Sequence, residues 1–156
     1  VLKREPADLE DLVRQSVRLV KAEAEQSAVA VEIQAEEGLS RAEVDPDKVR
    51  QVLLNIFLNA LAAKPKGGRL SVALNRRDDD VEIAVSDTGE GIRQENLPRI
   101  YDPYYTSKPA GTGLGLAVAQ KIMDAHGGAI EVESREGAGT RVALRFPFME
   151  KEGMGQ

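Results

Sequence analysis

The spacing of apolar residues along the chain predicts a succession of helices and strands. Apolar residues three and four positions apart predict helices over residues 8–28, 45–63 and 114–126. Apolar residues at every second position predict strands over residues 29–33, 42–44, 69–75, 81–86, 129–134 and 140–147. Helices and strands do not alternate strictly, so the order favours an α+β domain with helices on one face of a mixed sheet.

Local signals mark where these elements begin and end. Asp8 can cap the first helix. Asp45 followed by Pro46 is a strong helix start, because a capping carboxylate precedes a proline at the first helical position. Pro65 ends that helix, and Gly127 lies just after the end of the third one. We find no internal repeat and no internal domain boundary.

Composition narrows the class of function. The 156 residues, 42% hydrophobic and 30% charged, suit one soluble globular domain. A net charge of −5 argues against a mainly electrostatic nucleic-acid binder. The absence of Cys excludes disulfides and thiolate metal sites, and a single His excludes a multi-His site. There is no signal peptide and no apolar run of roughly 20 residues. Because the first residue is Val1, we expect a piece of a longer chain.

A polar stripe interrupts the otherwise apolar helix over residues 45–63. Gln51, Asn55 and Asn59 are four residues apart and therefore share one helix face. Asn is unfavourable inside helices because its amide competes for backbone hydrogen bonds. The stripe indicates either amide oxygens for a Mg²⁺ ion that also binds phosphate, or a buried amide pair that tethers a loop.

Asp87 follows the strand over residues 81–86. A carboxylate at a strand end can accept a hydrogen bond from an exocyclic amine, and Gly89 and Gly91 would let a planar ring approach the backbone. A plain Asp/Gly turn is the alternative. The spacing is not that of a dinucleotide fingerprint, because its third glycine would fall at Gln94.

Three alternating glycines, Gly111, Gly113 and Gly115, open the third helix. They would expose backbone amides at the positive end of the helix dipole, a site suited to phosphate. A flexible hinge is the alternative. Residues 101–108 contain all three tyrosines, which could anchor a loop, form a docking surface or make a local apolar patch. Lys108 in the same segment could reach a phosphate or stay solvated.

His126 is the only histidine and lies at a helix end. Asp124 is two residues away, a spacing that does not face His126 on a helix. A nucleophilic histidine would need a nearby carboxylate and an exposed position. We therefore interpret His126 as a structural residue that bonds terminal carbonyls.

In this order the motifs resemble those of the catalytic ATP-binding domain of bacterial sensor histidine kinases, in the nitrogen-regulation-like branch. That family belongs to the gyrase, chaperone and mismatch-repair ATPase superfamily, and the resemblance covers essentially the whole chain. The segments similar to the family's N, G1, F and G2 boxes and final glycine motif are residues 51–60, 87–91, 101–108, 111–116 and 137–140. The resemblance implies a Bergerat-type two-layer α/β sandwich, with three helices covering one face of a mixed sheet of about five strands.

The resemblance also implies roles for individual residues. Gln51 and Asn55 would be catalytic, Asn55 and Asn59 would hold Mg²⁺, and Asp87 would accept the adenine amine. The implied nucleotide contacts are Asn55, Asn59, Asp87, Gly89, Gly91, Lys108, Gly111, Thr112, Gly113, Leu114, Gly115, Leu116 and Thr140. The ATP lid would span about residues 93–111.

The chain departs from the family pattern in three respects. Ala62 stands where many members have a lysine, so Lys64 or Lys108 would supply the charge. The F-box segment has tyrosine where phenylalanine is common. The helical hairpin that carries the phosphoacceptor histidine is missing. We expect residues 1–8 to be a linker remnant, residues 9–148 the ATP-binding domain and residues 149–156 a tail.

The implied function is that of a protein-histidine kinase fragment in two-component signalling. It would bind Mg-ATP and donate the γ-phosphate to a histidine on a separate helical-hairpin domain of the same parent, with a response regulator as an indirect partner. We expect a cytoplasmic monomer that binds neither nucleic acid nor membrane, although the parent can be membrane-anchored. The alternatives are a sigma-factor-binding serine kinase, an ATP-gated ATPase module and a non-catalytic docking module.

Overall fold

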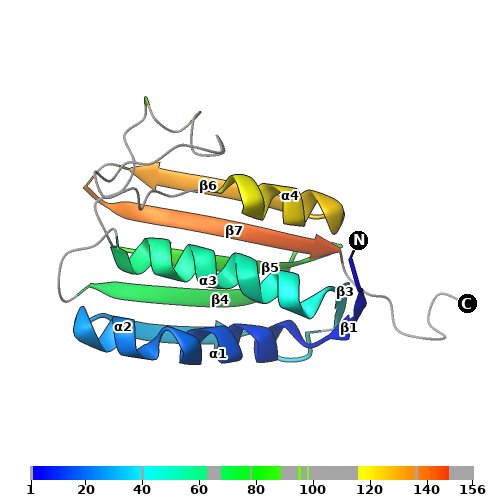
Figure 1. Ribbon diagram of the computed structural model, residues 1–156, viewed down its shortest axis with the longest axis horizontal. Helices are drawn as coiled ribbons and strands as arrows, with labels where there is room; N and C mark the ends of the chain where they lie inside the picture. Colours follow the sequence, from blue (N-terminus) through cyan, green and yellow to red (C-terminus); the bar gives the residue numbers. More distant parts are fainter. Residues whose placement is uncertain are drawn as a thin grey trace, which may run out of the picture.

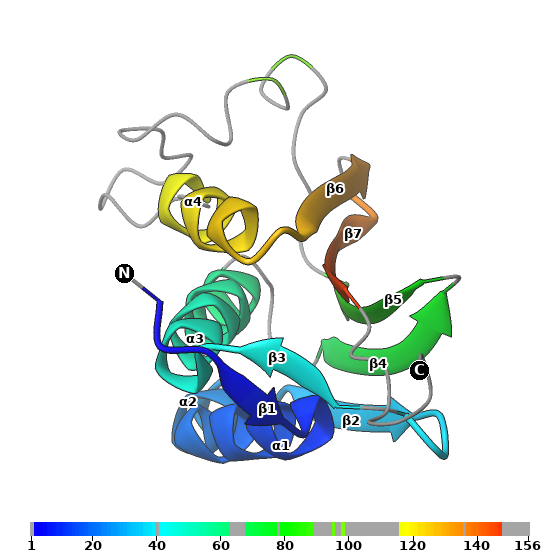
Figure 2. The ribbon, with the colours of Figure 1, turned by 90° about the vertical axis from the view of Figure 1, so that its right-hand side faces the viewer.

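The main sheet and the helices form two layers. The computed structural model describes residues 2–39, 41–62, 68–77, 79–88, 95, 98, 116–135 and 137–147. Its elements are β1 (Glu5–Ala7), α1 (Leu9–Leu19), α2 (Lys21–Gln26), β2 (Ala30–Ala35), β3 (Ala42–Val44), α3 (Pro46–Ala62), β4 (Arg69–Arg77), β5 (Asp80–Asp87), α4 (Ala117–Ala125), β6 (Ala129–Arg135) and β7 (Gly139–Pro147). Figures 1 and 2 show these helices on one side of a sheet with the strand order β2-β4-β5-β7-β6.

The sheet is mixed, as the sequence predicts. Strand β2 runs parallel to β4, and the other neighbouring strands are antiparallel. Alternate residues of β4, β5 and β7 are buried in the core that the sheet shares with the helices: Leu70, Val72, Leu74, Val81, Ile83, Val85, Val142, Leu144 and Phe146. The α+β class and the two-layer sandwich are therefore confirmed.

The single helix predicted over residues 8–28 is wrong in one respect, because it is two helices. At Val20 the backbone has φ −107° and ψ 11°, and its N–H bonds to the carbonyl of Val17 at 3.1 Å. The break buries Val20 and Ala24 and leaves Leu19 62% exposed. Neither Gly nor Pro marks the break, so packing decides it. Four helices in the described part therefore cover the sheet instead of three.

Helices α2 and α4 end in the same hydrogen-bonding motif. After α2, the N–H groups of Ala28 and Val29 bond back to Glu25 and Ala24 at 3.0 and 2.9 Å. This ending requires a left-handed residue, which is Ala28 at φ +56° after α2 and Gly127 at φ +72° after α4. Alanine is disfavoured there because its Cβ crowds the backbone, so Ala28 is strained where Gly127 is not.

A small second sheet lies at one end of the main one. Strand β1 pairs antiparallel with β3, so that Glu5 lies opposite Val44. The prediction of a strand over residues 42–44 is confirmed, but the apolar spacing does not predict β1, which contains Pro6. The segment we expect to be a linker thus makes sheet hydrogen bonds to the domain.

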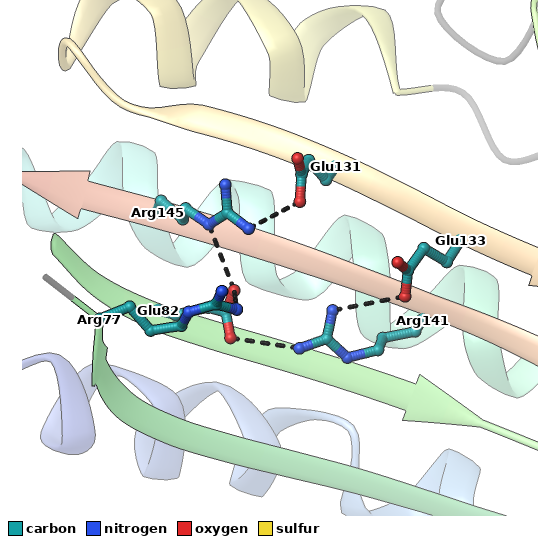
Figure 3. A network of polar contacts seen from close by, with 6 residues as sticks. All are labelled: Arg77, Glu82, Glu131, Glu133, Arg141 and Arg145. Atoms are coloured by element: carbon teal, nitrogen blue, oxygen red, sulfur yellow. Dashed lines mark hydrogen bonds and ion pairs between the residues drawn. The ribbon is translucent and has the colours of Figure 1, made fainter.

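On the sheet face away from the helices, three arginines surround a buried carboxylate (Figure 3). Glu82 is 2% exposed. Its oxygens lie 3.1 Å from Arg77, 3.2 Å from Arg141 and 3.3 Å from Arg145. Burial would lower the pKa of Arg145, but its hydrogen bonds to Glu82 and Glu131 and the charges of these carboxylates raise that pKa above its ordinary value. This network links β4, β5, β6 and β7 across a face that no described helix covers.

Candidate functional site

The amide stripe lies along α3 as its spacing predicts. Asp45 caps this helix, since its Oδ1 accepts the N–H of Lys48 at 3.4 Å. Gln51 is exposed, and Asn55 and Asn59 are half-buried. The Nδ2 of Asn59 donates to the Oδ1 of Asn55 at 3.5 Å, so the two amides face each other. The stripe is therefore a row of polar groups that solvent or a ligand can reach.

The first part of the stripe opens into a cleft between α3 and α4. The cleft has a volume of about 290 Å³. Its α3 side is formed by Gln51, Val52 and Asn55, and its α4 side by Val118, Ala119 and Ile122. One wall thus offers amides and the other is apolar.

Helix α4 begins directly after the glycine triplet, as the sequence predicts for a helix in this region. Leu116 precedes α4 and is fully buried, and its carbonyl accepts the N–H of Gln120 at 2.8 Å. No side chain in the described part of the chain caps this N-terminus. Uncapped N–H groups at the positive end of a helix suit a negatively charged ligand. The phosphate contact of Leu116 remains a prediction.

Asp87 and Thr140 meet at the edge of the sheet. Asp87 is the last residue of β5, is half-buried and lies opposite Thr140 on β7. The Thr140 hydroxyl lies 2.8 Å from the hydroxyl of Ser134, which donates to the carbonyl of Gly139 at 3.1 Å. Asp87 and Thr140 also line a hollow of about 490 Å³ at the ends of β5, β6 and β7. Two residues far apart in the sequence are therefore brought together, as their proposed common role requires.

Gly139 packs closely against the backbone of Asp87, a contact that the sequence alone does not predict. Its φ is +110°, and a Cβ there would lie 2.1 Å from the carbonyl oxygen of Asp87 and 3.2 Å from the Cα of Thr88. Any side chain would push β7 away from Asp87. The Gly137-Ala138-Gly139 turn is visible in the sequence, but which of its glycines packs against Asp87 is not.

The described site residues lie along α3 and at the edge of the sheet toward which α3 runs. Figure 1 shows that β5 ends, β7 begins and α3 ends on the left of that view, whereas α4 begins nearer the middle, beside α3. Six predicted residues lie in the described part: Gln51, Asn55, Asn59, Asp87, Leu116 and Thr140. Eight lie outside the described residues: Gly89, Gly91, Lys108, Gly111, Thr112, Gly113, Leu114 and Gly115.

His126 lies at the opposite end of α4, and its interpretation as a structural residue is confirmed. It is 3% exposed. Its Nδ1 lies 2.8 Å from the carbonyl of Ile122, and its Nε2 accepts the backbone N–H of Asp45 at 3.0 Å. The ring also packs edge-on against Phe146, with centroids 5.9 Å apart. Both ring nitrogens are occupied, so His126 cannot act as a nucleophile in this conformation.

Comparison with known families agrees with this geometry. The profile of one family, described as histidine kinase-, DNA gyrase B-, and HSP90-like ATPase, matches residues 44–150. The chain belongs to this ATPase family. It is 42% identical over 146 residues to the sensor histidine kinase ZraS of Salmonella typhimurium, a match that covers 93% of this chain and 31% of ZraS. The chain thus spans about a third of the length of the curated relatives it matches.

Solved structures of histidine kinases share the fold of this ATPase-family chain. The nucleotide-free catalytic domain of histidine kinase ThkA matches with a TM-score of 0.85 and 30% identity, over 94% of this chain and 97% of that one. ThkA in complex with the response regulator TrrA matches with a TM-score of 0.82 and 27% identity, over 96% and 43%. Full-length ShkA in complex with AMPPNP matches with a TM-score of 0.86 and 28% identity, over 97% and 32%. The resemblance to histidine kinase catalytic domains is confirmed, and nucleotide use follows from the family.

The described residues contain neither a membrane-spanning helix nor a cluster of potential metal-binding side chains. No described helix has the length and apolar character needed to cross a membrane. No cluster of three or more His, Cys, Asp or Glu side chains in the described ranges could hold a metal ion.

Proposed function

We propose that this ATPase-family domain binds ATP with Mg²⁺ and presents the γ-phosphate to a histidine on a separate helical-hairpin domain of its parent protein. A response regulator would then take the phosphate from that histidine. The observation that carries the proposal is the arrangement of the amide stripe, Asp87 and the start of α4: the stripe shares a cleft with the first residues of α4 and runs toward the end of the sheet that holds Asp87 (Figure 1). These groups suit a metal-bound phosphate chain, an amino-substituted base and a phosphate, respectively.

The base and the phosphates would bind on different elements. Asp87, at the end of β5, would accept the adenine amine, and Thr140 would contribute its hydroxyl beside it. The N–H groups at the start of α4, with those of the glycine triplet, would bind phosphate oxygens. Gln51 lies at the exposed start of the stripe, beside the α3–α4 cleft, where it would orient the γ-phosphate. Positioning and charge neutralisation supply most of the catalysis in phosphoryl transfer.

The amide stripe fits Mg²⁺ by its chemistry. Asn55 and Asn59 are hydrogen-bonded to each other at 3.5 Å and are half-buried, so both amides are held at one place. Mg²⁺ prefers hard oxygen ligands and is typically bound by one or two protein groups together with substrate phosphates and water. When bound, the ion would neutralise charge on the phosphates. Because position 62 is Ala, we propose that Lys64 or Lys108 supplies the further positive charge.

In this proposal the acceptor histidine lies outside this chain. His126 is the only histidine, and it is buried with both ring nitrogens hydrogen-bonded. ZraS is about three times as long as the matched region, and ThkA has been solved with a response regulator. These relatives support a parent protein with a separate phosphoacceptor domain and a response regulator as partner.

Calorimetric titration with Mg-ATP and Mg-ADP tests the nucleotide site. Asp87→Asn should weaken binding about 10- to 100-fold, because an amide replaces a charged acceptor and such hydrogen bonds contribute roughly 1.5–3 kcal/mol. Asp80→Asn is the matched control, since it changes the same group at the other end of β5. Absence of binding by the wild type would reject the proposal. Unchanged binding by Asp87→Asn would remove Asp87 as the base-reading residue.

Phosphotransfer requires the parent's helical hairpin supplied in trans. With γ-labelled ATP, label should appear on a hairpin histidine only when this domain and Mg²⁺ are both present. Label on serine of an added protein would favour a serine kinase, and release of phosphate without labelling would favour an ATPase module. Nucleotide binding with neither outcome would favour a docking module.

A further inference from the structure

A junction of three chain segments lies at the end of the sandwich opposite Asp87. We define it by Lys3, Arg4, Asp45, Ala125 and His126. The backbone N–H of Lys3 donates to the Asp45 carboxylate at 3.0 Å, and Arg4 donates to the carbonyl of Ala125. The backbone N–H of Asp45 donates to His126 Nε2 at 3.0 Å. The start of the chain, the beginning of α3 and the end of α4 are thus bonded together.

The two hydrogen bonds of His126 are both satisfied by a single protonation state of its imidazole ring. A carbonyl only accepts, so Nδ1, 2.8 Å from the Ile122 oxygen, must carry the proton. A backbone N–H only donates, so Nε2 beside Asp45 must be without a proton. The imidazole is therefore neutral and in the Nδ1–H form. The Nε2 bond joins the end of α4 to the start of α3, and the Nδ1 bond lies within the last turn of α4. The Phe146 ring packs edge-on against the imidazole between these bonds.

The two helices that meet at the junction are those assigned to the phosphates. Helix α3 carries the amide stripe, and α4 begins at the glycine triplet. Helix α4 has nine residues, or about 14 Å at 1.5 Å per residue, and packs along α3 at a cleft lined by Asn55 and Ile122. The carbonyl of Ile122 is the one that His126 binds. A shift at the junction would therefore change the spacing of the two helices at the cleft.

We infer that His126 is a positioning residue, which sets the spacing of α3 and α4 through Asp45 and couples it to the incoming strand β1. The inference rests on the proposed nucleotide site and adds a route by which an upstream segment acts on it. Movement of β1 would pull on Asp45 through Lys3 and on Ala125 through Arg4. Nucleotide held between the two helices would in turn hold the junction in one arrangement, because coupling between two sites is reciprocal.

Two amide variants of His126 separate the two hydrogen bonds. The shorter side chain of His126→Asn can still donate to Ile122, but it cannot reach the N–H of Asp45. The longer side chain of His126→Gln can accept from Asp45 but gives up the bond to Ile122. Both variants bury one amide, so both should lose stability to a similar degree. We expect His126→Asn to bind Mg-ADP about fivefold more weakly than His126→Gln, at the lower end of typical coupling between sites.

NMR spectra of the single imidazole provide a second test, which uses the wild-type protein. Because the chain has one His, its two ring nitrogen resonances are assigned without ambiguity in long-range ¹H–¹⁵N spectra. We expect the Nδ1–H pattern without nucleotide and a change in both resonances on saturation with Mg-ADP. Arg4→Ala, an exposed change, should also move these resonances and weaken binding about twofold.

The outcomes distinguish this inference from the proposed function. If the wild type binds Mg-ADP but its imidazole resonances do not respond, the inference is wrong and the nucleotide site stands. Equal affinities for His126→Asn and His126→Gln, with both less stable than the wild type, would show that His126 only supports the fold. If the wild type does not bind nucleotide, the proposed function fails and the inference fails with it.

Discussion

The two ends of the sandwich hold their polar groups in different ways. Toward the end where β5 stops, Asp87, Asn55 and Asn59 are half-buried, and Asp87 and Asn55 each line a cleft. At the junction, His126 is 3% exposed and Asp45 is 7% exposed, and their polar atoms bond to backbone groups from other segments. At the first end a ligand can reach the polar groups. At the junction the polar groups are buried and hydrogen-bonded within the protein.

This difference in exposure distinguishes polar groups that bind a ligand from polar groups that stabilise the fold. A buried polar group is tolerated when its hydrogen bonds are satisfied within the protein, and it then rigidifies the structure around it. A group that must bind a ligand needs access to water when the ligand is absent. The same helices, α3 and α4, connect the two ends, so a rigid junction can position the groups at the nucleotide end.

Gly139→Ala should have the largest effect, because it acts on the backbone that carries Asp87. The new Cβ would lie 2.1 Å from the Asp87 carbonyl oxygen, and φ +110° is strained for alanine. We expect a loss of about 3 kcal/mol or more in unfolding free energy, measured with denaturant, together with lost adenine-nucleotide binding.

Gly137→Ala is the matched control for that change. Gly137 has φ +83°, but nothing lies within 4 Å of its Cβ position. The Gly137→Ala variant should lose only about 1–2 kcal/mol of unfolding free energy and should keep the nucleotide affinity of the wild type. Equal losses in the two variants would contradict the role of close packing against Asp87.

Asp45 should make the junction sensitive to acid. The N–H of Lys3 lowers the pKa of Asp45 below its ordinary value of 3.8; burial opposes this, and the N–H groups of Lys48 and Asp47 reinforce it. A lowered folded-state pKa means that ionised Asp45 stabilises the fold above about pH 4, and that this stability is lost as pH falls through the folded pKa. Asp45→Asn, which still caps α3, should therefore show a shallower loss of unfolding free energy below about pH 4.

Denaturant unfolding of both proteins between about pH 5 and pH 2 measures this difference. Wild-type and Asp45→Asn curves that fall in parallel would show that another titratable group controls the acid response.

Ala28→Gly should have the smallest effect, and it stabilises. Ala28 has φ +56° at a helix end where α4 has Gly127. Relief of the strain should raise the unfolding free energy by about 1 kcal/mol or less, since glycine also gains freedom in the unfolded chain. The reverse change, Gly127→Ala, has room for its Cβ, 4.0 Å from Pro147, and should lose a similar amount. A destabilised Ala28→Gly would contradict the assigned strain.

Much of the fold follows from the sequence, because it depends on local periodicity. Alternating residues such as Leu70, Val72 and Leu74 could only bury one face of a strand, and all three are buried. Asp45-Pro46 begins α3 as predicted. The break at Val20 and strand β1 do not follow, because each depends on contacts with distant segments: Val20 with the core, and residues 5–7 with residues 42–44.

The candidate site divides along the same line. The spacing of Gln51, Asn55 and Asn59 determined that they share one helix face, because this depends on helix geometry alone. The net charge, the single histidine and the lack of cysteine limited the possible ligands and metal sites, because these depend on residue type alone. Only the tertiary structure placed Thr140 beside Asp87, made Gly139 necessary to that contact and joined His126 to Asp45, 81 residues away along the chain. Strand register and helix packing determine which distant residues come into contact. Both depend on how side chains from the whole chain pack in the core.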